Sequence, residues 1–117
     1  MLRAMGNLER DPQLRNPDHL AVRFLTPTMR LRVQVAPLRT LTLRVVQRML
    51  PGAHPFITAR TKHLDAILAE EIRAGVRRVA ILGAGADSRA YRFAESMPGV
   101  TVFEVDQIGR ASCRERV

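Results

Sequence analysis

The chain has 117 residues, of which 46% are hydrophobic, 4% are aromatic and 26% are charged, and its formal net charge is +8. A chain of this length forms at most one modest domain. The scarcity of aromatic residues argues against a nucleic-acid reader that stacks bases on aromatic side chains. The single cysteine cannot form an internal disulfide and does not indicate a zinc site, so no metal is expected.

The positive charge is concentrated in the N-terminal half. Residues 1–62 hold 11 Lys/Arg and 3 Asp/Glu, a net charge of +8, whereas residues 63–107 hold 5 and 7, a net charge of −2. Such a basic segment is compatible with a non-enzymatic binding module for nucleic acid or anionic lipid. A solvated arginine face on an amphipathic helix is the simpler interpretation, so we expect neither nucleic acid nor membrane as a partner. Without a bilayer-length apolar run or a secretory start, a cytoplasmic location is expected.

The first part of the chain gives weak structural signals. Residues 1–15 show no clear periodicity and are predicted to be a mobile lead-in. The sequence Asn16-Pro17-Asp18 is typical of a helix start, and it predicts a short helix that stops near Thr26-Pro27.

Further helices are predicted up to residue 54. Thr28 can begin a segment that Pro37 breaks or kinks. From Leu38, apolar residues recur at helical spacing until Pro51-Gly52 ends the pattern. We therefore expect a helical segment over residues 16–54.

The clearest helical pattern runs from Pro55 to Ala74. Its apolar face is marked by Ile57, Leu64, Ile67, Leu68 and Ile72. Glu70 and Glu71 lie off that face and are interpreted as solvated positions rather than catalytic acids. Gly75 is expected to end the helix.

A strand, a glycine turn and a helix start follow. Val79 to Leu82 is a short apolar run of the kind found in parallel strands buried on both faces. Gly83 and Gly85 come next, and Asp87-Ser88 can cap a helix. This order lets backbone N–H groups and the helix dipole face a ligand over the end of the strand. Glycine keeps the backbone bare and reaches positive φ easily.

A second strand with an acidic end is predicted over Val100 to Asp106. Asp106 lies 23 residues after Gly83. In nucleoside-binding α/β folds a carboxylate at this place accepts hydrogen bonds from both ribose hydroxyls. NAD(P)-dependent oxidoreductases have the same order of strand, glycine turn and acidic strand end. Their dinucleotide-binding motif, however, has a third glycine where this chain has Ser88. An oxidoreductase therefore stays open as an alternative.

Three segments in this order resemble successive signatures of one family. They are residues 59–65, 75–92 and 102–107. The family they resemble is the leucine carboxyl methyltransferase-like family of class I S-adenosylmethionine-dependent methyltransferases, in its bacterial branch. The resemblance implies an α/β fold class, as the N-terminal part of a Rossmann-like methyltransferase fold in which N-terminal helices precede the first two parallel strands. Residues 16–54 would form a helical lid, and residues 55–107 would begin the S-adenosylmethionine-binding domain.

The resemblance also implies a set of cofactor contacts. Arg60 would hold the methionyl carboxylate of S-adenosyl-L-methionine, a task that suits a planar guanidinium. The other contacts implied are Gly83, Ala84, Gly85, Asp87, Asp106 and Gln107. The methyl acceptor would be a carboxylate or hydroxyl of a small molecule. No catalytic base, acceptor identity or oligomeric state follows from these residues.

Residues 108–117 carry neither periodicity nor family resemblance. They look like the in-frame translation of a sequencing-library adapter, so they are predicted to be a non-native tail. On this hypothesis the gene continues beyond residue 107 and the chain is a truncated methyltransferase. Strand 77–82 would then lack the neighbour expected on its other side, which leaves apolar faces exposed and an edge unpaired. The 117-residue chain would be marginally stable or prone to aggregation, and catalytically inactive.

Overall fold

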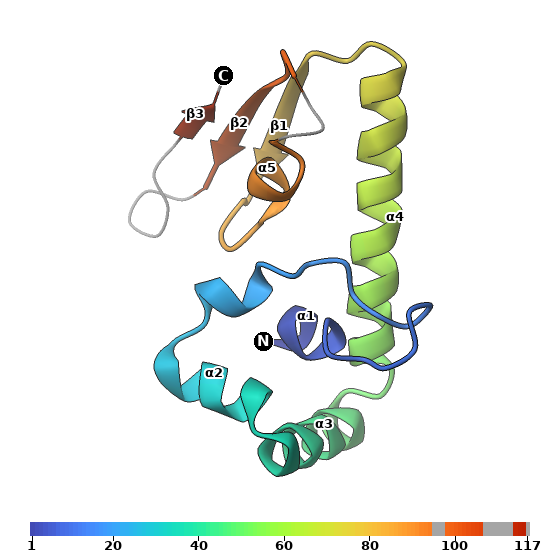
Figure 1. The fold of residues 1–117 in the computed structure, drawn as a ribbon, viewed down its shortest axis with the longest axis vertical. Coiled ribbons are helices and arrows are strands. Elements are labelled where there is room, and N and C mark those ends of the chain that lie inside the picture. The colour runs from blue at the N-terminus through green and yellow to red at the C-terminus, as the bar shows by residue number, and fades with distance from the viewer. Residues whose placement is uncertain (95–97, 107–113, 117) are drawn as a thin grey trace. The chain divides into compact units, whose positions relative to one another are not determined.

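The computed structural model describes residues 1–94, 98–106 and 114–116 (Figure 1). The chain divides into two compact units, Met1–Leu64 and Asp65–Val117. The division falls within one helix, α4 (Ala53–Arg73).

The first unit is helical. It contains α1 (Leu2–Gly6), the 3-10 helix η1 (Ala21–Phe24), α2 (Pro27–Gln34), α3 (Ala36–Met49) and the first part of α4. The hydroxyl of Thr26 accepts the N–H of Met29 (3.4 Å), and a proline at the first position of α2 needs no N–H partner. Pro37 lies in the first turn of α3 for the same reason. The predicted helices from Leu38 and from Pro55 are thus confirmed.

Residues 2–6 form a helix that is too short to show a period and is buried by contacts with distant residues, while the mobility predicted for residues 1–15 stays a prediction. Two predictions for this unit were wrong in detail. The region after Asn16 forms only the 3-10 helix. The side-chain oxygen Oδ1 of Asn16 accepts the Asp18 N–H (2.9 Å) and so forms a tight turn in place of a helix start. Thr26, not Thr28, caps the next helix.

The core of the first unit combines small apolar residues with buried polar groups. The apolar cluster is formed by Ala4, Met5, Ala21 and Val33. Beside it, the fully buried amide of Asn16 donates to Thr58 Oγ1 (3.5 Å) and Thr61 Oγ1 (3.4 Å). Gly6 allows close approach here, since a Cβ would lie 3.0 Å from Asn16 Cβ and from Thr58 Oγ1. These contacts fix the N-terminal residues onto the start of α4.

Helix α4 ends as its sequence predicts. Gly75 has a φ of 107°, a conformation that favours glycine. Its N–H donates to the Ile72 carbonyl (3.1 Å), and the Val76 N–H donates to the Glu71 carbonyl (3.0 Å). This pair of bonds is the Schellman motif, which satisfies the last carbonyls of the helix and turns the chain into the first strand.

The second unit contains a three-stranded sheet. Strand β1 (Arg78–Leu82) pairs in parallel with β2 (Thr101–Val105), and β3 (Arg114–Arg116) pairs with β2 in antiparallel fashion, so the order is β1-β2-β3 (Figure 1). The short helix α5 (Arg89–Arg92) connects the two parallel strands. The predicted α/β class with parallel strands is confirmed. Strand β3 falls within the predicted tail, whose origin stays a prediction.

The prediction that β1 is buried on both faces was wrong. Val79 and Ile81 pack with Ala90 and Phe93 and with residues of α4, whereas Ala80 and Leu82 point the other way. Leu82 is 78% exposed. An apolar run of this kind predicts a strand but not what covers it, and within the described residues only one face of β1 is covered. As expected, β1 also lies at an edge of the sheet that the described strands form.

The helices of the described part of the chain all fall short, in length or in apolar content, of what a bilayer crossing requires.

Candidate functional site

The glycine turn directly follows β1. Gly83 has a φ of 64° and Gly85 a φ of 47°, so both adopt the left-handed conformation that the sequence predicts. Between them, the N–H of the buried Ala84 donates to the Val105 carbonyl at the end of β2 (3.1 Å). The Asp87 N–H donates back to the Ala84 carbonyl (2.6 Å) and closes the turn. The turn therefore lies at the C-terminal ends of both parallel strands.

Asp106 is hydrogen-bonded to this turn. In the strand register Leu82 is opposite Val105, so the residues that follow each strand emerge at the same level. The Gly85 N–H donates to Asp106 Oδ2 (2.6 Å), a short charge-assisted hydrogen bond. The glycine turn and the acidic strand end, 21 residues apart, thus lie together.

The turn leaves bare backbone to which a nucleoside can approach. Among the described residues, none would lie within 4 Å of a Cβ built on Gly83. A Cβ on Gly85 would meet Asp106 Oδ2 at 3.5 Å, an ordinary contact. Among the described residues nothing fills the space beside Gly83, and a carboxylate, which is an acceptor of hydrogen bonds, borders it. These residues fit the ribose end of a nucleoside.

Two arginines and two aspartates next to the turn form a network of ion pairs. Asp65, which is 9% exposed, accepts the Arg89 Nε–H at Oδ1 (2.8 Å) and both Arg92 Nη groups, at Oδ2 (2.6 Å) and Oδ1 (2.9 Å). Arg89 also binds Asp87 Oδ2 (2.5 Å), and the Arg92 Nε–H donates to the fully buried Ser88 Oγ (2.9 Å). Arg89 therefore bridges the two aspartates.

Asp87 also begins the helix that follows the turn. Its Oδ1 accepts the Arg89 N–H (2.9 Å), while the side chain of Ser88 makes no capping bond. The predicted cap at Asp87-Ser88 is therefore provided by the aspartate. The helix that it starts has only four residues.

Sequence reasoning missed the role of Asp65. A usable signal was present, because Asp65 lies on the stripe of α4 that also carries Thr61, Leu68 and Ile72. A carboxylate on a buried helix face needs a cationic partner to offset its desolvation. Arg89 and Arg92, three residues apart on one short helix, can both provide it.

The structure does not test the two remaining predicted contacts. Arg60 is exposed and belongs to the first unit, on α4, so its role in cofactor binding stays a prediction. Gln107 lies outside the described residues. Among the described residues no group of three or more His, Cys, Asp or Glu could hold a metal ion.

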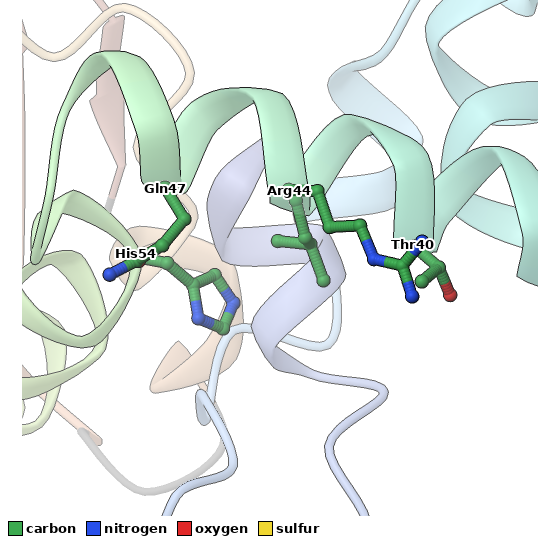
Figure 2. Close-up of a pocket in the computed structure, with 5 residues that line it drawn as sticks. Thr40, Arg44, Gln47 and His54 are labelled. Atoms are coloured by element: carbon green, nitrogen blue, oxygen red, sulfur yellow. The ribbon is translucent and has the colours of Figure 1, made fainter.

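A separate shallow pocket of about 310 Å³ lies within the first unit. It is lined by Thr40, Leu43, Arg44, Gln47 and His54. Figure 2 shows the Arg44 side chain reaching toward Thr40 and away from His54. None of the predicted cofactor contacts lines this pocket.

A glycine turn and a carboxylate at the C-terminal edge of parallel strands are the means by which α/β proteins bind nucleotides and nucleosides. Comparison with known proteins narrows this class. The profile of the leucine carboxyl methyltransferase family matches residues 1–117, so the chain belongs to that family.

Several relatives carry names that describe S-adenosyl-L-methionine-dependent methyltransferases. One from Mycobacterium avium is 55% identical over 51 residues, which cover 44% of this chain and 16% of the relative. One from Mycobacteroides abscessus is 52% identical over 52 residues, or 44% of this chain and 17% of the relative. One from Frankia alni is 37% identical over 105 residues, or 90% of this chain and 35% of the relative. The chain thus spans only about a sixth to a third of these relatives, and no solved structure gives a significant match.

Proposed function

We propose that this protein binds S-adenosyl-L-methionine through the glycine turn and Asp106, as part of an enzyme that methylates a small molecule. The observation that carries the proposal is the hydrogen bond from the Gly85 N–H to Asp106 Oδ2, which joins the turn to the acidic strand end. Family membership and the names of the relatives support it.

Each predicted contact has a role that its chemistry suits. The bare backbone at Gly83 and Gly85 admits the nucleoside, with Ala84 holding the turn to β2. Asp106, as an ionised carboxylate that only accepts hydrogen bonds, would accept the ribose hydroxyls. Arg60 would bind the methionyl carboxylate through its planar fork. Gln107, next to Asp106 in the sequence, completes the set.

The bound cofactor supplies an electrophilic methyl group on a sulfonium sulfur. The chain's own residues bind and orient that cofactor, and orientation of two reactants accounts for much of the acceleration in transfer reactions. The proposed acceptor is a carboxylate or hydroxyl of a small molecule. A cytoplasmic location is proposed with it.

The oxidoreductase alternative has less support. The third glycine of the dinucleotide fingerprint is replaced by Ser88, which is buried and bonded to Arg92. The family match also favours methyl transfer over hydride transfer. A basic binding module explains the arginines of residues 1–62 but not the geometry at Asp106.

Calorimetric titration of the 117-residue chain with S-adenosylhomocysteine and with NADH tests the proposal. We expect S-adenosylhomocysteine to bind and NADH not to bind. Asp106→Asn should weaken S-adenosylhomocysteine binding at least about tenfold, because the amide replaces an ionised acceptor of two hydroxyl donors. Glu70→Gln, which removes an exposed carboxylate on α4, is the matched control and should leave binding unchanged. Binding of NADH instead, or equal affinities for the D106N variant and the unmodified chain, would refute the proposal.

A further inference from the structure

We infer that Asp65 is a positioning residue for the cofactor site, because it holds through Arg89 and Arg92 the residues that close the glycine turn. The inference rests on the proposed function. It extends the site from the turn itself to the ion-pair network behind it, which is formed by Asp65, Asp87, Arg89 and Arg92.

The Asp65 carboxylate is the centre of this network. It accepts three hydrogen bonds of 2.6–2.9 Å from two guanidinium groups, and two of them form a fork with Arg92. The side chains of Asp65 and Arg92 are only 11% and 6% exposed. The two carboxylates and two guanidinium groups of the network balance one another in charge.

Each arginine links Asp65 by hydrogen bonds to a residue at the turn. Arg89 binds Asp87 through its guanidinium and through its backbone N–H, which engages both oxygens of that carboxylate. Arg92 binds Ser88 Oγ. Asp87 in turn donates its N–H to the Ala84 carbonyl, between the two glycines. A continuous path of hydrogen bonds therefore runs from Asp65 to the backbone that faces the cofactor.

Positioning explains the network better than stability does. Burying an ion pair carries a desolvation cost that often cancels its Coulombic gain, so such a network contributes little net stability. Glycines at positive φ have no side chains to hold their conformation, and a site must be held closely to bind well. The network therefore restrains the backbone conformation of the turn, which the glycines cannot do themselves. The part of Asp87 in the network is to hold the turn in place.

Substitution of Asp65 tests this inference on the 117-residue chain. Asp65→Asn should weaken S-adenosylhomocysteine binding about tenfold, because a misplaced turn no longer matches the ligand. Asp65→Glu, which keeps an ionised acceptor, should recover part of the affinity. Asp18→Asn is the matched control: it alters a buried carboxylate of the first unit, which pairs with Arg3 (3.0 Å), and it should leave affinity unchanged. If D65N prevents folding, Arg92→Lys keeps the charge but loses the fork, and it should weaken binding in the same direction.

The NMR resonances of the glycine amides in the free protein distinguish a positioning role from a loss of stability, because a loss of stability alone does not shift them. D65N should shift the Gly83 and Gly85 resonances and leave that of Gly6 in place. Wild-type affinity together with unshifted glycine resonances in D65N would overturn the inference. If the unmodified chain fails to bind S-adenosylhomocysteine, the proposed function fails, and the resonances of the free protein still decide whether Asp65 positions the turn.

Discussion

The two units of the chain both bury polar side chains, but they use them differently. In the first unit, Asn16 reaches Thr58 and Thr61, 42 and 45 residues away, and the contacts hold the N-terminal residues to a helix. In the second unit, Asp65 reaches Arg89 and Arg92, 24 and 27 residues away, and the contacts end at a turn beside which the described part of the chain leaves space. Burial alone therefore does not distinguish a structural polar group from one that serves a site, as we propose for Asp65. What distinguishes them is where the chain of hydrogen bonds ends.

Asn16→Ala should have the largest effect on stability. It leaves the buried Asp18 N–H without its acceptor and removes both threonine contacts, so we expect a loss of about 3 kcal/mol in the free energy of unfolding. Denaturant unfolding followed by circular dichroism measures it. Gln13→Ala, at an exposed position, is the control and should change little. Equal stabilities of the two variants would show that the Asn16 cluster contributes nothing.

Two glycines sharpen the contrast between the units. Gly6→Ala forces a Cβ to 3.0 Å from two neighbours, and overpacking of this kind should cost about 2 kcal/mol. Gly85→Ala meets only an ordinary contact, and its left-handed φ should cost about 1 kcal/mol. Only the Gly85 variant should also lose affinity for S-adenosylhomocysteine. A Gly6 variant that lost as much affinity as the Gly85 variant would break the comparison.

Adjacent residues of β1 provide a matched pair within the second unit. Ile81→Ala removes a side chain packed in the apolar cluster and should cost about 1.5 kcal/mol. Leu82→Ala, on the exposed face, should change the free energy of unfolding by no more than about 0.5 kcal/mol. The same Leu82 variant should reduce self-association, which light scattering would detect. A greater loss of stability for Leu82→Ala than for Ile81→Ala would mean that the other face is covered.

The smallest expected effect concerns the N-terminus. Burial lowers the pKa of the Met1 amine below its ordinary value of 8.0, Arg3 lowers it further, and Asp18 opposes the shift. At pH values between the lowered pKa and 8.0, the unfolded chain therefore binds more protons than the folded chain does. The free energy of unfolding should for this reason rise with pH over that range. Thermal midpoints across this range measure the rise. Acetylation of the amine should remove the slope, and an unchanged slope would assign it to another group.

Much of the second unit could be predicted from the sequence because its signals are local. The apolar run of β1, the two glycines at positive φ and the meeting of Gly85 with Asp106 all follow from residue types and spacing. The end of α4 at Gly75 follows in the same way. The one-sided burial of β1 could not be predicted, because it depends on which elements cover the strand.

The first unit was predicted less well because its structure depends on distant contacts. Helix α1 has five residues, too few for a period, and it is held by contacts with residues far along the chain. The polar cluster around Asn16 joins residues that no local pattern connects. Asp65 could have been singled out as a carboxylate on a buried helix face, but its partners could not have been assigned from spacing alone.

The glycine amide resonances give the most direct test of the central claim, that the turn at Gly83 and Gly85 binds the cofactor beside Asp106. Titration of the 117-residue chain with S-adenosylhomocysteine should shift the resonances of Gly83 and Gly85 saturably. Those of Gly6 and Gly52, in the first unit, should stay in place. Unshifted Gly83 and Gly85 resonances at ligand concentrations that saturate calorimetric binding would contradict the account.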